Sequence, residues 1–254
     1  MWNAAKYRQF SNERDRPFFD LIAHVPLAQA ATIADLGCGD GHLTAGLLER
    51  APDAQIWGVD SSSEMLKSAV DIPGRLEFIR ADLSEWNPPQ QLEVIVSTAA
   101  LQWVPDHASL IPQLTAMLES GGCLAVQMPA NFEAPLHAIL RELTADPQWE
   151  LQGVKEWRHA QPLEWYVETL SELGFSVNAW ETSYLHVLHG QNPVLEWVKG
   201  TALRPILARL EGERHEAFLE AYGERLVDAY PAKSFGTPLP FKRAFFVAVN
   251  DKRG

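Results

Sequence analysis

The sequence predicts an α/β fold in which a seven-stranded, mostly parallel sheet carries helices on both faces. Three observations predict it. Through the first half of the 254 residues, short β-rich runs alternate with segments of helical periodicity, the pattern of βαβ units. A glycine-rich turn follows the first of these runs. Two more β-rich runs, with helical segments around them, occupy the second half.

Seven runs have the composition of strands. The first five are short and apolar, as strands buried on both faces of a parallel sheet are. They are Thr32–Leu36, Gln55–Asp60, Leu76–Arg80, Leu92–Ser97 and Cys123–Met128. The sixth, Ser176–His186, alternates between polar and apolar residues, and the seventh, Arg243–Val249, is a candidate buried strand.

Helical periodicity fills the intervals between these runs. The expected helices are His42–Arg50, Ser62–Val70, Ser109–Leu118, Glu133–Thr144, Pro162–Leu173, Pro193–Lys199, Arg204–Leu210 and Glu213–Ala229. Gly121 and Gly122 are expected to end the third helix, and Gly174 to cap the fifth. Pro231–Pro240, which contains prolines and a glycine, is expected to be a loop.

The composition is that of a soluble globular protein, since 46% of the residues are hydrophobic and 21% are charged. With 33 acidic and 21 basic residues, the net charge of −12 would repel phosphate backbones, so nucleic acid is not an expected partner. Two cysteines suggest no disulfide framework, no apolar stretch is long enough to span a membrane, and the N-terminus lacks a signal-peptide core. We expect a cytoplasmic protein without a membrane partner, and a monomer or weak homodimer. The eight histidines have no metal-ligand spacing, so we expect no metal.

The most informative stretch is Ala34–His42, which has the pattern Asp-x-Gly-x-Gly-x-Gly between the first strand and the first helix. Glycine lets the backbone bend sharply and lets a ligand approach it closely. The dinucleotide fingerprint Gly-x-Gly-x-x-Gly would need a glycine where His42 stands, and a Tyr-x-x-x-Lys pair for hydride chemistry is missing from its expected place. Asp35 at the strand tip would repel a pyrophosphate but favour a cationic amino-acid group.

Acidic residues also end the second and third strands. Asp60 lies 21 residues after Gly39, where a carboxylate can accept hydrogen bonds from two ribose hydroxyls. Asp82 could accept a hydrogen bond from an exocyclic amine, with Leu83 against an adenine face. Because parallel sheets bind ligands beyond the carboxyl ends of their strands, we expect these groups to form one site.

The order of glycine turn, Asp60 and Asp82 resembles motif I and the following strand ends of the S-adenosylmethionine-dependent methyltransferases. The resemblance implies the class I methyltransferase fold, which is Rossmann-like with an antiparallel last strand. It implies S-adenosyl-L-methionine as cofactor and S-adenosyl-L-homocysteine as its product. The implied cofactor-binding residues, of which Cys38 contributes backbone only, are Asp35, Gly37, Cys38, Gly39, Asp60, Ser61, Asp82, Leu83 and Thr98.

Other segments resemble the family of trans-aconitate 2-methyltransferases, nearly end to end from Tyr7 to Val249. They include Glu13–Pro17, Leu101–His107, Leu124–Phe132, Trp180–Tyr184 and Trp197–Pro205. The resemblance implies methyl transfer to one carboxylate of trans-aconitate, giving its monomethyl ester. It also implies a single methyltransferase domain over residues 1–254, with a lid formed by N-terminal helices in residues 1–30 and by a helical insertion at residues 187–240.

The implied reaction needs no general base, because a carboxylate is already deprotonated at neutral pH. We therefore assign no catalytic residue, and expect alignment of the reacting atoms and exclusion of water to be the main devices. Gln102 and Trp103 follow the fourth strand, where they could hydrogen-bond the acceptor and exclude water; core packing is the alternative for Trp103. Arginine suits the remaining carboxylates best, and the candidates are Arg14, Arg16, Arg204 and Arg243, with Arg158 a weaker one. Each could instead be a surface arginine paired with an acid, and Arg14 could hold the carboxylate of the cofactor.

Other functions stay open at this point. The chain could be a carboxyl methyltransferase for another small acid, or for malonyl thioester on acyl carrier protein. The second would need a basic docking surface, which a net charge of −12 disfavours. A non-catalytic cofactor-binding protein could keep the same fold, but the intact glycines and strand-end acids disfavour that alternative.

Overall fold

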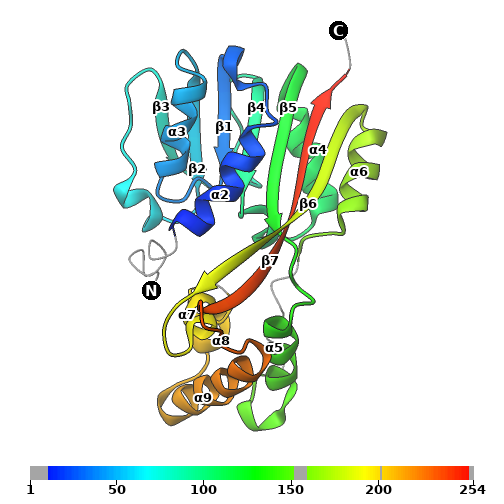
Figure 1. Ribbon diagram of the computed structural model, residues 1–254. Helices are drawn as coiled ribbons and strands as arrows, with labels where there is room; N and C mark the ends of the chain where they lie inside the picture. Colours follow the sequence, from blue (N-terminus) through cyan, green and yellow to red (C-terminus); the bar gives the residue numbers. More distant parts are fainter. Residues whose placement is uncertain (1–10, 152–158, 201, 252–254) are drawn as a thin grey trace. The chain divides into compact units, whose positions relative to one another are not determined.

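The computed structural model describes residues 11–151, 159–200 and 202–251, without the side chains of residues 11–14 and 204. In this part of the chain seven strands form one sheet in the order β3-β2-β1-β4-β5-β7-β6 (Figure 1). Their bounds are β1 Thr32–Leu36, β2 Gln55–Asp60, β3 Leu76–Arg80, β4 Leu92–Thr98, β5 Leu118–Pro129, β6 Phe175–Leu188 and β7 Thr237–Asn250. The first five strands pair in parallel and β7 pairs antiparallel with β5, so the predicted seven-stranded, mostly parallel fold is confirmed.

In the described residues, α-helices precede β1 and lie between β1 and β2, between β4 and β5, between β5 and β6, and between β6 and β7. They are α2 Ser11–Ile22, α3 His42–Arg50, α4 His107–Ala116, α5 Pro135–Ala145, α6 Leu163–Glu172, α7 Pro193–Lys199, α8 Arg204–Leu207 and α9 Gly212–Ala229. The described residues also contain the 3₁₀ turns η1 Leu27–Gln29, η2 Met65–Ser68, η3 Leu101–Trp103 and η4 Pro147–Trp149. Among the described residues, no helix combines the length and the apolar composition that crossing a membrane requires.

The chain divides into two compact units. The sheet unit comprises residues 11–129, 159–182 and 243–251, and the helical unit comprises residues 130–151, 183–200 and 202–242. Strands β6 and β7 contribute residues to both units. Each unit is described by itself below.

In the sheet unit, the chain leaves β1 toward β2 and β3 on one side and returns to β4 and β5 on the other. The strand order therefore reverses between β1 and β4, and in doubly wound sheets ligands bind at such a reversal. One face of the sheet is covered by α4 and α6, whose Leu110, Leu114 and Leu170 join the same apolar core as Ile95 and Leu124 of the sheet. The carboxyl ends of β1 and β4 are thus fixed by a packed core.

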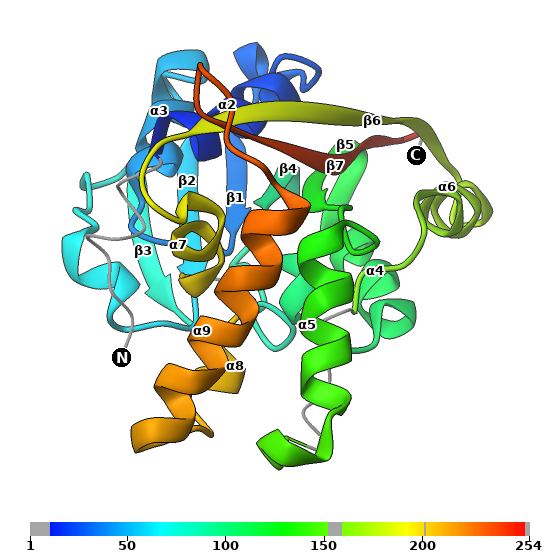
Figure 2. The same ribbon diagram turned by 60° about the horizontal axis from the view of Figure 1, so that its bottom comes forward.

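In the helical unit, α5 and α9 lie side by side (Figure 2). Leu136, Leu140 and Leu143 of α5 are buried at the helical spacing that the sequence shows. The hydroxyl group of the buried Tyr222 in α9 donates to the carbonyl of Leu136 at 2.9 Å. An amphipathic pair of helices and their aromatic residues therefore form the core of this unit.

Three predicted element bounds are wrong for identifiable reasons. The helix expected at Ser62–Val70 is only the short turn η2: Ser62 Oγ accepts from Met65 N at 3.3 Å, as an N-cap does, but the backbone becomes extended at Ala69, whose N–H closes a 3₁₀ bond to Leu66. The helix expected from Ser109 begins at His107, because Asp106 caps it by accepting from Ser109 N. Gly121 and Gly122 lie inside β5, which shifts register opposite β4 there.

Three ends in the second half also differ. Helix α8 stops at Leu207, three residues before the expected Leu210. Strand β7 begins at Thr237, within the stretch expected to be a loop. Its neighbour β6 is also longer than its alternating pattern predicts, since it continues to Leu188.

Candidate functional site

The turn between β1 and α3 is built from glycines in the left-handed region. Gly37, Gly39 and Gly41 have φ angles of 82°, 61° and 79°. A Cβ atom on Gly37 would lie 2.1 Å from the Cβ of Ala100, and one on Gly41 would lie 2.4 Å from Cζ of Phe78. At these two positions a side chain would be strained by the backbone angle and would displace Ala100 or Phe78. The turn is therefore a bare backbone cradle beside the end of β4.

Asp60 joins this turn to the end of β2. Its Oδ2 accepts from the backbone N–H of Gly39 at 2.9 Å, and its Oδ1 accepts from the N–H of Ser62 at 2.8 Å. Burial raises the pKa of Asp60, while the two backbone hydrogen bonds oppose the rise. Each carboxylate oxygen can accept a second hydrogen bond, so Asp60 can bind a ligand hydroxyl without giving up either backbone bond. The neighbouring Ser61 is exposed.

Asp35 ends β1 in a buried position, with 2% of its surface exposed. Its Oδ2 accepts from the hydroxyl of Thr44 at 2.6 Å. Its buried Oδ1 has no hydrogen-bond partner among the residues that the structure describes. Burial, partly offset by the Thr44 hydrogen bond, raises the pKa of Asp35 to about 6. A buried anionic oxygen without a donor is costly, and a bound cation or N–H group would relieve that cost.

The end of β3 carries Asp82 and Leu83. Asp82 is exposed, and its Oδ1 accepts from both the backbone N–H and the hydroxyl of Ser84, at 2.9 and 2.6 Å. Leu83 is half-buried against the core of the sheet unit. Asp82 therefore closes a turn of its own and presents its carboxylate at the surface, next to an apolar side chain.

The end of β4 leads into a tight turn. Thr98 is half-buried, and Ala99 has a φ angle of 53°, which is unusual for a residue with a side chain. The N–H of Ala99 donates to the carbonyl of Gln127 at 2.9 Å, and its carbonyl accepts from Nε2 of Gln102 at 2.6 Å. Oε1 of Gln102 is buried and has no hydrogen-bond partner within the described ranges. Trp103, in contrast, is 42% exposed.

The candidate arginines lie in different settings. Arg243 is 5% exposed, and its Nη1 donates to Oε1 of Gln127 at 2.7 Å. Arg16 has a side chain that is 70% exposed and forms an ion pair with Asp20 at 3.8 Å. Gln127 therefore connects Arg243 to the turn after β4, because its side chain accepts from Arg243 and its backbone carbonyl accepts from Ala99. The remaining candidates have side chains or positions outside the described residues: Arg14, Arg158 and Arg204.

Cys38 lies in the glycine turn with its thiol buried. Burial raises the pKa of this thiol far above neutral pH. Its backbone N–H donates to the carbonyl of Val59 at 3.1 Å, and its carbonyl accepts from the N–H of Gly41 at 3.1 Å. Cys38 thus shapes the turn through its backbone.

His42 links two elements, a role that was not predicted from the sequence. Its Nδ1 lies 2.7 Å from Oδ1 of Asp40, and its Nε2 lies 3.1 Å from Oδ2 of Asp15 in α2. The hydrogen bond to Asp40, with a further contribution from Asp15, raises the pKa of His42 to about 9. His42 is therefore protonated at neutral pH and holds α2 to the glycine turn. Asp40 is two residues away and could have been suspected, whereas nothing in the sequence indicates Asp15.

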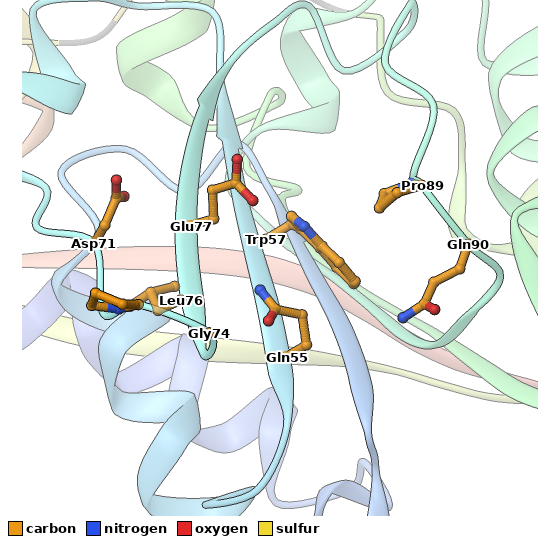
Figure 3. A pocket seen from close by; sticks show the side chains of 9 residues that line it. Gln55, Trp57, Asp71, Gly74, Leu76, Glu77, Pro89 and Gln90 are labelled. Atoms are coloured by element: carbon orange, nitrogen blue, oxygen red, sulfur yellow. The ribbon is translucent and has the colours of Figure 1, made fainter.

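A surface hollow lies away from these strand ends (Figure 3). It includes Gln55 and Leu76, the first residues of β2 and β3. At roughly 3.3 Å per residue, the length of β2 separates Gln55 from Asp60 by about 17 Å. The hollow is therefore distinct from the site at the carboxyl ends. In the described residues, no group of three histidine, cysteine or acidic side chains could hold a metal ion.

Comparison with known proteins identifies the family. The family described as "Methyltransferase domain" matches residues 33–122, which contain the glycine turn, Asp60 and Asp82. A trans-aconitate 2-methyltransferase of Streptomyces avermitilis is 45% identical over 97% of this chain and 96% of its own length. One of Azoarcus sp. is 42% identical over 98% of both chains.

The chain belongs to the trans-aconitate 2-methyltransferase family.

Solved structures agree on the fold of this family member. A putative methyltransferase from Bacillus halodurans superposes with a TM-score of 0.61 at 14% identity, covering 93% of this chain and 100% of the other. The phosphoethanolamine N-methyltransferase 2 of Haemonchus contortus, in complex with S-adenosylhomocysteine, gives a TM-score of 0.56 at 17% identity, over 94% of this chain and 53% of the other. At these identities the likeness shows the fold alone, and that fold is the predicted class I methyltransferase sheet.

Proposed function

We propose that this protein is an S-adenosylmethionine-dependent methyltransferase that esterifies one carboxylate of trans-aconitate to its monomethyl ester. The observation that supports trans-aconitate as the acceptor is the 45% identity, over 97% of the chain, to the Streptomyces avermitilis trans-aconitate 2-methyltransferase. This match extends far beyond residues 33–122, which many methyltransferases share. It therefore takes in the candidate arginines, which all lie outside that segment, as well as Gln102 and Trp103 within it.

The residues at the carboxyl edge fit the adenosyl cofactor. The glycine turn is a cradle that a Cβ atom would fill, and Asp35 Oδ1 is a buried acceptor with no donor in the described parts of the chain. In this proposal Asp60 holds the ribose hydroxyls, Asp35 faces the ammonium group, and Asp82 with Leu83 binds the adenine. Ser61, Thr98 and the backbone of Gly37, Cys38 and Gly39 complete the contacts. When bound, S-adenosylmethionine supplies a methyl group made electrophilic by its positively charged sulfur.

The acceptor needs orientation and neutralisation of its other carboxylates. Trans-aconitate is ionised at neutral pH, so no side chain has to remove a proton. We propose that Gln102 and Trp103 position the acceptor and exclude water, and that Arg243 provides a buried cation near the turn after β4. Arg14, Arg16 and Arg204 remain further candidates for binding carboxylates. Because the attacking anion and the sulfonium neutralise each other, a site that excludes water favours the reaction.

Replacement of Asp60 tests the cofactor half of this proposal. Asp60→Ala removes the hydrogen-bond acceptors for the ribose and for Gly39, so we expect the affinity for S-adenosylhomocysteine to fall at least about 100-fold in titration calorimetry. Methyl ester formation from trans-aconitate should fall with it. The matched control is Asp53→Ala, which removes an exposed carboxylate from the turn before the same strand and should bind as the parent does. An Asp60→Ala protein that folds and binds like the parent would refute the ribose role.

A further inference from the structure

A series of buried hydrogen bonds links α6 and α4 to the turn after β4. His107, the first residue of α4, is 1% exposed. Its Nε2 lies 2.9 Å from the carbonyl oxygen of Leu101, and its Nδ1 lies 2.5 Å from the hydroxyl of Tyr166 in α6. The Tyr166 hydroxyl in turn accepts from the backbone N–H of Gln161 at 3.0 Å. All these residues belong to the sheet unit.

The direction of each hydrogen bond follows from the chemistry. Burial lowers the pKa of His107, so its ring is neutral and carries one proton. The Leu101 carbonyl can only accept, so that proton is on Nε2 and Nδ1 is the acceptor. Burial raises the pKa of Tyr166, so its hydroxyl keeps its proton and donates it to Nδ1. Met128 Sδ, at 3.9 Å from the hydroxyl, is a much weaker acceptor.

This series of hydrogen bonds ends at the turn η3. The Leu101 carbonyl already accepts from the N–H of Val104 at 2.9 Å, and the His107 bond occupies its second lone pair. The same turn carries Gln102 and Trp103, and the residue Ala99 before it is held in the left-handed region. A residue with a side chain keeps that conformation only where its surroundings fix it. His107 thus fixes the turn on the side of α4.

We propose that His107 and Tyr166 are positioning residues that hold the turn Leu101–Trp103 in the geometry needed for methyl transfer. This inference rests on the proposed function, because it gives Gln102 and Trp103 their place beside the acceptor. The two residues act through the turn and touch neither cofactor nor acceptor. Their loss should lower turnover of the acceptor and leave cofactor affinity unchanged.

Two amide substitutions separate this role from core packing. The amide of glutamine is one bond farther from Cβ than that of asparagine. His107→Gln can therefore place a donor near the Nε2 position, whereas His107→Asn reaches only the Nδ1 position. Both variants lose a buried ring and should show similar decreases in Tm. We expect kcat/KM for trans-aconitate to fall about 10- to 100-fold in His107→Asn and at most about threefold in His107→Gln, since small misplacements of reacting groups are costly.

Tyr166→Phe tests the other end of this series of hydrogen bonds. It removes the proton that fixes Nδ1 as an acceptor, so we expect kcat/KM for the acceptor to fall about three- to tenfold. The matched control is Thr115→Val on the same helix, which removes the hydroxyl bonded to the Pro112 carbonyl at 2.9 Å. Thr115 lies eight residues along α4 from His107, so its variant should lose stability but keep the parent kcat/KM.

Hydrogen exchange gives a readout that does not depend on the acceptor. In protein saturated with S-adenosylhomocysteine, backbone amides of residues 99–104 should exchange faster in His107→Asn and Tyr166→Phe, but not in His107→Gln or Thr115→Val. Titration calorimetry should give S-adenosylhomocysteine affinities within about twofold of the parent for all four. Equal effects of the two His107 variants on exchange and turnover, or a loss of cofactor affinity, would overturn the positioning role. A parent that does not methylate trans-aconitate would instead refute the proposed function, and the exchange result would still decide the inference.

Discussion

Asp35 shows at the scale of one residue how stability and ligand binding oppose each other. Its pKa is raised to about 6 by burial, so its carboxyl group is ionised at pH 7 although it is buried. The folded state binds the proton more tightly than the unfolded chain does. The resulting cost is absent below pH 3.8, grows between pH 3.8 and 6, and is complete above pH 6, where it is on the order of 3 kcal/mol.

Asp35→Asn should therefore stabilise the protein while lowering its affinity for the cofactor. The amide can still accept from Thr44 but carries no buried charge. In urea unfolding we expect the variant to exceed the parent by up to about 3 kcal/mol at pH 8 and by much less at pH 4.5. Its affinity for S-adenosylhomocysteine at pH 8 should be about 10- to 100-fold lower, because a charge-assisted hydrogen bond is lost. Parent-like affinity would exclude Asp35 as the partner of the ammonium group.

His42 has the opposite sign of pH dependence. Its pKa is raised to about 9 by Asp40 and Asp15, so its stabilising effect is fully present below pH 6.5 and is lost as the pH rises through 9. His42→Gln removes the charge and should abolish this dependence. We expect the Tm of the parent to exceed that of the variant at pH 6.5 and to match it near pH 10. The difference should shrink in high salt, because the side chain is half exposed. A difference that does not change with pH would contradict a protonated link.

At the scale of elements, the glycine turn and the strand ends could be predicted from local sequence. The order of strand, glycines and helix is contiguous in the chain, and Asp60 follows at the distance that a βαβ unit sets. The partners of His42 and His107 could not be predicted in this way. Tyr166 is 59 residues from His107, and only the packing of α6 against α4 brings the two together.

Two glycine substitutions separate the cost of a strained backbone angle from the cost of a steric clash. Gly37 and Gly74 both have positive φ angles, 82° and 73°, but only Gly37 faces a close neighbour, Ala100. Gly74→Ala should cost about 1 kcal/mol for the backbone angle alone. Gly37→Ala should cost about 1–3 kcal/mol more, because the added Cβ displaces the turn after β4.

Chemical unfolding and calorimetry measure both consequences. Binding of S-adenosylhomocysteine should be lost in Gly37→Ala and kept in Gly74→Ala. Equal stability of the two variants would mean that the Ala100 contact relaxes at no cost. Retained binding in Gly37→Ala would mean that the cofactor does not need the bare turn.

At the scale of the whole molecule, the alternation of strands and helices predicts the parallel part of the sheet, whereas the antiparallel last strand was implied by the family resemblance. The division into a sheet unit and a helical unit was not predictable from the alternation, because β6 and β7 are continuous strands whose residues belong to both units. The assignment of residues 1–30 and 187–240 to a lid stays a prediction. So does the choice among the arginines, since three of the candidates have side chains or positions outside the described residues.

The net charge of −12 opposes binding of the acceptor, because an acidic protein has to bind a trianion. The most direct test compares acceptors with saturating S-adenosylmethionine, using purified protein and mass spectrometry of the products. We expect one monomethyl ester of trans-aconitate for each S-adenosylhomocysteine formed, and a kcat/KM at least about tenfold above those for cis-aconitate, isocitrate, citrate and free fatty acids. Equal rates across these acids, or no ester of trans-aconitate, would contradict the proposed function.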